Sequence, residues 1–199
     1  MPITGMKSRR TAILGGSFDP VHIGHLFLMH EACILAGVER ILLVPANLSN
    51  FKQGKPPVSF HHRFRMLELA REDYRDLYPE DDLEIIVSPI EGERKGVSYS
   101  SDTVRELIPE YGDNGRISFI IGDDIPKDLP KWHDWPYLRE HVDYICFRRE
   151  GGERCPDEKA SVSYIDSDIL ESSSSRVRSG DQSRLSERVR RYLEDEKLY

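Results

Sequence analysis

The sequence predicts an α/β protein: a Rossmann-like, doubly wound parallel sheet followed by a small C-terminal helical subdomain. Short apolar runs alternate with longer segments of helical periodicity, and the runs are apolar throughout rather than at every second position. Strands of that kind suit a parallel sheet that helices cover on both faces. The 199 residues suit a single domain over 1–199. Within it we expect a core at about 10–150 and the helical subdomain at about 160–199.

The first half of the chain is divided by glycine and proline residues. Arg10–Leu14 is a short apolar run that ends in a turn at Gly15 and Gly16, and Gly37 is a typical helix stop. We predict strands over 10–14, 40–44 and 83–87, helices over 23–37 and 60–74, and a polar loop over 46–58. The shared face of the first helix is predicted to carry Ile23, Leu26, Phe27, His30 and Ile34.

The second half continues the alternation and then becomes more polar. A helix over 101–111 precedes two strands, over 117–121 and 143–147, and a charged turn follows over 151–159. A serine run over 172–175 leads to an amphipathic helix near 185–193. This alternation of strands and helices is the reason to expect helices on both faces of the sheet.

Charge and cysteine content limit the class of partner and the compartment. The net charge is −7 and the pI is about 5.5, whereas proteins that coat nucleic acid usually carry the opposite balance. Three widely spaced cysteines give neither a disulfide framework nor a zinc pattern, and no apolar run suits a membrane span or signal core. We expect a cytoplasmic protein without nucleic-acid or membrane partners, and leave a homo-oligomer open.

The stretch from Gly15 to His25, GGSFDPVHIGH, lies between the first predicted strand and the first predicted helix. Ligands of open parallel sheets bind at such strand ends, where adjacent glycines admit a phosphate and the helix start offers N–H groups. His22 and His25 are three residues apart, so both rings can donate hydrogen bonds to one phosphoryl oxygen. The alternatives are a tight turn with an Asp19 cap and two surface histidines, or a two-histidine metal site.

The same stretch resembles the T/HxGH signature of the nucleotidyltransferase superfamily. It lacks the Lys-Ser/Thr of a Walker loop and the spacing of a Rossmann Gly-x-Gly-x-x-Gly fingerprint. In that superfamily the histidines of His-x-Gly-His stabilise the transferred α-phosphate, so the resemblance implies a catalytic role for His22 and His25. It also implies that ATP is bound by these two histidines and by Gly15, Gly16, Ser17 and Phe18.

Four later segments resemble bacterial nicotinate-nucleotide adenylyltransferases, and the resemblance spans roughly residues 11 to 195. The first is VPANLSNFK over 44–52, followed by Arg63 and by MLELA over 66–70. The family usually has Pro-Pro-His-Lys in this loop, so Lys52 matches the lysine and Phe51 replaces the histidine. The second is SYSSDT over 98–103, and the third is FIIGDD over 119–124 followed by Trp132. The fourth is SSSRVR over 173–178, similar to the family's Ser-Ser-Thr-x-Ile-Arg.

These segments extend the expected site to both substrates. A helix start near Ser100 offers N–H groups to a ring carboxylate, and Trp132 offers a flat face to a pyridine ring. The four segments could instead have purely structural explanations, namely helix caps, a solvated lysine, a serine-rich linker and a half-buried tryptophan. The resemblance adds Lys52, Gly122, Asp124, Ser174, Ser175 and Arg178 to the ATP-binding residues, and implies mononucleotide binding by Ser17, Lys52, Tyr99, Ser100, Thr103 and Trp132.

The resemblance implies transfer of AMP from ATP to nicotinic acid mononucleotide. The products are nicotinic acid adenine dinucleotide, an intermediate of NAD biosynthesis, and pyrophosphate. Mg²⁺ is expected to enter with ATP and to be held mainly by its phosphates, without a dedicated protein metal site. Two alternatives stay open: nicotinamide mononucleotide or phosphopantetheine as the acceptor, and a non-catalytic ATP-binding module on the same fold.

Overall fold

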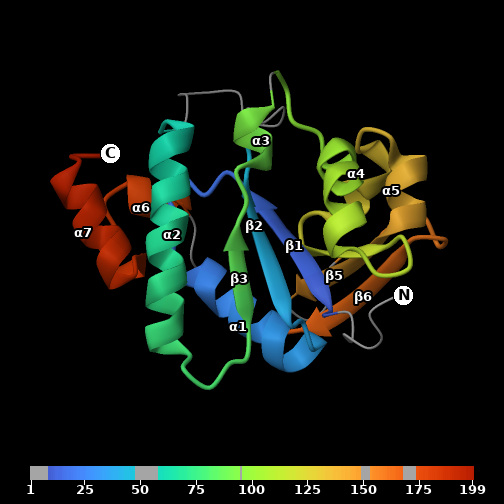
Figure 1. Cartoon of the computed structure of the whole chain (residues 1–199), viewed down its shortest axis with the longest axis horizontal. Coiled ribbons are helices and arrows are strands. Elements are labelled where there is room, and N and C mark those ends of the chain that lie inside the picture. Colours follow the sequence, from blue (N-terminus) through green and yellow to red (C-terminus); the bar gives the residue numbers. More distant parts are fainter. Residues whose placement is uncertain (1–8, 48–57, 95, 149–152, 168–173) are drawn as a thin grey trace, which may run out of the picture.

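A six-stranded parallel sheet forms the centre of the molecule (Figure 1). The computed structural model describes residues 9–47, 58–94, 96–148, 153–167 and 174–199. The strands follow the order β3-β2-β1-β4-β5-β6, and every neighbouring pair is parallel. This order confirms the predicted Rossmann-like α/β fold. The strands are β1 Thr11–Gly16, β2 Arg40–Pro45, β3 Glu84–Val87, β4 Ile117–Gly122, β5 Val142–Arg148 and β6 Ser161–Asp166.

Helices cover both faces of the sheet, as the alternating pattern predicts. One apolar cluster joins the sheet to α1, α2 and α7 through Leu26, Leu67 and Val189, and a second joins it to α4 and α5 through Val104 and Leu138. Figure 1 shows α2 and α7 on one side and α4 and α5 on the other. The helices are α1 Ile23–Ala36, α2 Phe60–Leu77, α3 Ile90–Glu93, α4 Ser100–Tyr111, η1 Pro126–Lys131, α5 Trp135–His141, α6 Ser174–Arg178, η2 Gln182–Arg184 and α7 Glu187–Asp195.

Three features of the structure differ from the sequence-based expectation. The strand β1 runs through the two glycines that were expected to form the turn. The shared face predicted for α1 includes Ile34, which is 52% exposed, because α1 is apolar nearly all round and the sheet selects Leu26, Met29, Ala32 and Ala36 instead. The sheet also continues beyond residue 160, since β6 pairs with β5. We retain the division into a core and C-terminal helices as a proposal.

The strand order reverses between β1 and β4. The chain passes from β1 through α1 to β2 on one side of β1, whereas β4 lies on the other side. In open parallel sheets, ligands bind at the carboxyl ends of the strands where the order reverses. The residues at these ends are Gly16 and Gly122. None of the described helices has both the length and the apolar character needed to cross a membrane.

Candidate active site

A cavity of about 730 Å³ opens at the carboxyl ends of β1 and β4. Its walls come from the signature stretch after β1, from the start of α4 and from the segment that follows η1. These segments are far apart in the sequence, and the reversal of strand order brings them together. Of the residues predicted from the sequence, Gly15, Gly16, Ser17, His25, Tyr99, Ser100, Thr103, Gly122 and Trp132 line this cavity.

The two signature histidines are in contact but differ in their surroundings. His22 directly precedes α1, and His25 lies in its first turn, with 3.8 Å between the ring centroids. The backbone N–H of His22 donates to Nδ1 of His25 at 3.2 Å. Because Nδ1 accepts this bond, a neutral His25 ring carries its proton on Nε2, where it can donate. Burial lowers the pKa of His22 to about 4, so His22 is neutral at pH 7.

The signature stretch leaves little room for a side chain at Gly15, whereas a Cβ at Gly16 would make an ordinary contact. A Cβ at Gly15 would lie 3.2 Å from the Phe119 ring, and one at Gly16 would meet the Phe18 ring at 3.4 Å. Phe18 is buried, and its ring centroid lies 4.9 Å from that of His25. The backbone therefore forms part of the cavity wall itself, while Phe18 supports His25 and is not among the residues that line the cavity.

Aromatic rings form a second part of the cavity wall. Tyr99 is the residue before α4, and the His133 ring stacks on it with 4.1 Å between centroids. Nδ1 of His133 lies 3.1 Å from the Ser101 hydroxyl, which connects this ring to the first turn of α4. Trp132 meets the edge of Phe119 at 5.9 Å between centroids. Trp132 and the start of α4 thus face the same space, as the sequence predicts.

Thr103 is held by an acidic residue that the sequence analysis did not identify. Its hydroxyl donates to Oε1 of Glu91 at 2.7 Å, and both residues are buried and line the cavity. Burial raises the pKa of Glu91, whereas the Thr103 hydrogen bond and the charge of Arg94 act in the opposite direction. Glu91 lies on α3, a four-residue helix that is too short to show a periodic pattern.

The serine run and its arginine contact the signature stretch from outside the cavity. The Ser174 hydroxyl donates to the carbonyl of Pro20 at 2.9 Å. Arg178 donates to the main-chain carbonyl of Asp19 and, at 3.1 Å, to the Ser175 hydroxyl. These three predicted residues therefore lie beside the signature stretch, although none of them lines the cavity.

Asp124 and Lys52 are the remaining predicted residues. Asp124 is exposed, and its Oδ1 lies 3.1 Å from the position that a Gly122 Cβ would take, so it lies beside a cavity-lining residue. Lys52 lies outside the described residues. The structure also adds Lys131 and His133 to the cavity wall. In the sequence, only their position next to Trp132 could have indicated these two residues, because neither belongs to a motif of its own.

Comparison with known proteins gives the family of the chain. Residues 13–180 match the family model described as cytidylyltransferase-like. A Lactococcus lactis protein named "probable nicotinate-nucleotide adenylyltransferase" is 32% identical over 197 residues, which cover 96% of this chain and 95% of that protein. A Treponema pallidum protein of the same name is 35% identical over 138 residues, which cover 68% of this chain and only 64% of that protein.

Solved structures of similar proteins share the fold. The Plasmodium falciparum nicotinic acid mononucleotide adenylyltransferase complexed with NaAD superposes with a TM-score of 0.71 at 21% identity, covering 96% of this chain and 97% of that one. The family model spans most of the sequence, and the Lactococcus relative matches over nearly its whole length. The chain therefore belongs to the nicotinate-nucleotide adenylyltransferases of the cytidylyltransferase-like family.

Proposed function

We propose that this chain transfers AMP from ATP to nicotinic acid mononucleotide, forming nicotinic acid adenine dinucleotide and pyrophosphate in NAD biosynthesis. The observation that supports this most directly is the shared cavity. It places His25 and the glycine backbone of the signature stretch in one space with Trp132 and the start of α4. A phosphate-binding backbone and an aromatic, carboxylate-binding wall are what a nicotinate mononucleotide and ATP require together.

The chemistry needs positioning rather than a protein nucleophile. An oxygen of the mononucleotide phosphate attacks the α-phosphorus of ATP, and the new P–O bond forms as the bond to the β-phosphate breaks. Pyrophosphate leaves with the electron pair of that bond. Catalysis of this kind rests on alignment and on stabilising charge at the α-phosphate. We assign that stabilisation to Nε2–H of His25 and to the neutral ring of His22.

The mononucleotide is assigned to the wall formed by α4 and Trp132. The N–H groups of Asp102 and Thr103 already donate to the Tyr99 carbonyl, so we assign the ring carboxylate to the N–H groups of Ser100 and Ser101 at the helix start. Trp132 stacks on the pyridine ring, and Ser17 and Tyr99 complete the contact. The Thr103 hydroxyl already donates to Glu91, so we assign Thr103 to the support of this wall and not to a direct hydrogen bond with the mononucleotide.

ATP is assigned to the signature stretch and to the residues around it. Gly15, Gly16, Ser17 and Phe18 would follow the triphosphate, and Gly122 with Asp124 would lie near the nucleoside. Ser174, Ser175 and Arg178 would hold the β- and γ-phosphates from the side of Asp19 and Pro20. We also propose that Lys52 binds both ATP and the mononucleotide, as the family resemblance implies.

Mg²⁺ would enter with ATP and neutralise charge on the phosphates. The described residues contain no group of three or more histidine, cysteine or acidic side chains that could hold a metal ion. We expect the phosphates and water to supply most of the Mg²⁺ ligands. Action in the cytoplasm, and either a monomer or a homo-oligomer, remain predictions.

Release of pyrophosphate with a panel of acceptors tests this proposal. The purified chain is mixed with ATP and Mg²⁺, and pyrophosphate is measured with nicotinic acid mononucleotide, nicotinamide mononucleotide, phosphopantetheine or no acceptor. We expect release only with an acceptor, and fastest with the acid. ATP binding without release for any acceptor would instead favour a non-catalytic ATP-binding module.

A further inference from the structure

Arg63 is a fully buried arginine beside the cavity. It lies in the first turn of α2 and is only 1% exposed. Burial lowers the pKa of its guanidinium, while Asp19, Tyr199 and Glu91 act to raise it. Arginine stays charged in proteins because its ordinary pKa is above 12. Burying a charge costs free energy, so we expect the Arg63 guanidinium to have hydrogen-bond partners that compensate for this cost.

Among the described residues, the hydrogen bonds of Arg63 all go to main-chain carbonyl groups, and its guanidinium also lies 5.6 Å from the centre of the Phe60 ring. Nη1 donates to Ser17 at 2.8 Å and to Ala46 at 2.6 Å, and Nε donates to Val58 at 2.9 Å. Nη2 donates to Asn47 at 3.4 Å. The planar guanidinium thus joins the signature stretch to the segment that follows β2 and to the residue that precedes α2 by two positions.

Two of these acceptors belong to residues that line the cavity. Ser17 and Ala46 approach the same Nη1 atom, and the backbone N–H of Ala46 donates to the carbonyl of Gly16 at 2.8 Å. Loss of the guanidinium would leave buried carbonyls without this donor and would let the two segments separate. Arg63 is therefore the side chain that links these two walls of the cavity, beside the main-chain hydrogen bond from Ala46 to Gly16.

We propose that Arg63 is a positioning residue for adenylyl transfer, which fixes the signature stretch against the segment after β2. This inference rests on the proposed function. Arg63 touches no substrate in this account; it acts through the backbone at Ser17 and Ala46. A misplacement of about 1 Å at a reacting centre costs up to about 100-fold in rate, so the effect falls mainly on kcat.

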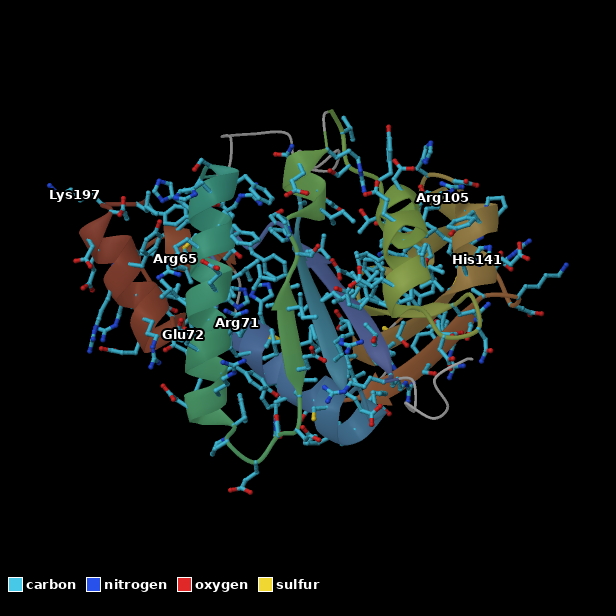
Figure 2. The ribbon with its side chains drawn as sticks, in the orientation of Figure 1. Arg65, Arg71, Glu72, Arg105, His141 and Lys197 are labelled. Atoms are coloured by element: carbon cyan, nitrogen blue, oxygen red, sulfur yellow. The ribbon has the colours of Figure 1, made fainter. Side chains whose placement is uncertain are left out.

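Arg63→Lys tests the proposal, since lysine keeps the charge but lacks the planar fork of donors. We expect kcat to fall at least about tenfold at saturating substrates in a folded variant. Arg63→Gln is the second variant, because it is neutral and still donates, and the same loss is expected. Arg65→Lys is the matched control: Arg65 lies on the same helix (Figure 2), its side chain is 46% exposed, and it pairs with Glu68. It should keep wild-type turnover.

Hydrogen–deuterium exchange gives a readout that does not depend on turnover. Both Arg63 variants should exchange faster around Ser17 and Ala46, with β4 unchanged. A folded variant with turnover within threefold of wild type and unchanged exchange would overturn the proposal. Failure of both variants to fold would assign Arg63 to global stability and would also overturn it. Lack of turnover in the wild type would contradict the proposed function alone, since the exchange comparison would still test Arg63.

Discussion

His22 and His25 share one helical turn, yet the structure gives them different chemistry. His25 lines the cavity, and the hydrogen bond to its Nδ1 leaves Nε2 as the donor. His22 is 7% exposed and neutral at pH 7, so it cannot supply a positive charge to the phosphate. We propose that both rings act as neutral groups. We expect His25 to matter more for turnover, because His22 is not among the residues that line the cavity.

Replacement of His25 tests its role at the α-phosphate. We expect His25→Ala to lower kcat about 100- to 1,000-fold, as measured elsewhere for loss of one oxyanion-type donor. The control is His141→Ala, because His141 ends α5 and directly precedes β5, whereas the cavity opens at the carboxyl ends of the strands. Figure 2 labels this residue beside α5. It should stay within twofold of wild type. A folded His25→Ala variant with turnover near wild type would remove His25 from the reaction.

The buried His22 makes a prediction about stability and pH. Its pKa is about 4 in the folded chain and about 6.5 when unfolded, so the unfolded state binds more protons between these values. The free energy of unfolding should therefore fall as pH drops from about 7 to 5, by about 2 kcal/mol from His22. Urea unfolding of wild type and His22→Gln at both pH values measures this. Equal losses in the two proteins would contradict the account.

Among the secondary-structure elements, the central strands could be predicted from the sequence, because strands buried on both faces form continuous apolar runs. The run over 40–44 is apolar at nearly every position, and β2 is buried along almost its whole length. The edge strand β6, by contrast, has no buried residue and alternates in exposure, so its sequence resembles an ordinary polar segment. The helix α5 escaped prediction because seven residues are too few to show a helical period.

The residues of the candidate site could be predicted where they belong to a local sequence motif. They could not be predicted where they join the site through long-range contacts. The strand–turn–helix stretch with His25 and the residues around Trp132 can be read locally, and both line the cavity. Glu91 bonds to Thr103, 12 residues away, and no spacing rule identifies that pair. Arg63 belongs to the first segment of the family resemblance, but its partner Ser17 is 46 residues away and could not be identified from the sequence. The folded structure alone shows that the predicted Thr103 hydroxyl is already bonded.

The short helix α6 gives a prediction about ATP. Arg178 contacts the carbonyl of Asp19 and lies 3.7 Å from its carboxylate, so binding a polyphosphate would exchange this contact for a stronger anionic partner. We expect Arg178→Ala to raise the KM for ATP and to slow the reverse reaction with pyrophosphate, with Arg178→Lys less affected. Equal effects on ATP and on the mononucleotide would show that Arg178 only holds the signature stretch in place.

At the scale of the whole molecule, the proposed function requires an acidic protein to select an anionic substrate. The net charge is −7, so the overall field favours a neutral amide over a carboxylate. The buried Glu91 carboxyl in the cavity wall adds to this difficulty, although burial raises its pKa and so favours its neutral form. Selection of the acid must therefore come from local donors, for which the first turn of α4 is placed beside Trp132.

The preference for acid over amide is the most direct test of nicotinic acid mononucleotide as the acceptor. An amide would turn its own N–H groups toward donors and leave groups unpaired at about 1–3 kcal/mol each. One or two such mismatches give a preference on the order of ten- to a thousand-fold. The measurement is kcat/KM for nicotinic acid mononucleotide and for nicotinamide mononucleotide, at saturating ATP and Mg²⁺. We expect a preference for the acid in that range; equal values or a preference for the amide would rule out nicotinic acid mononucleotide as the preferred substrate.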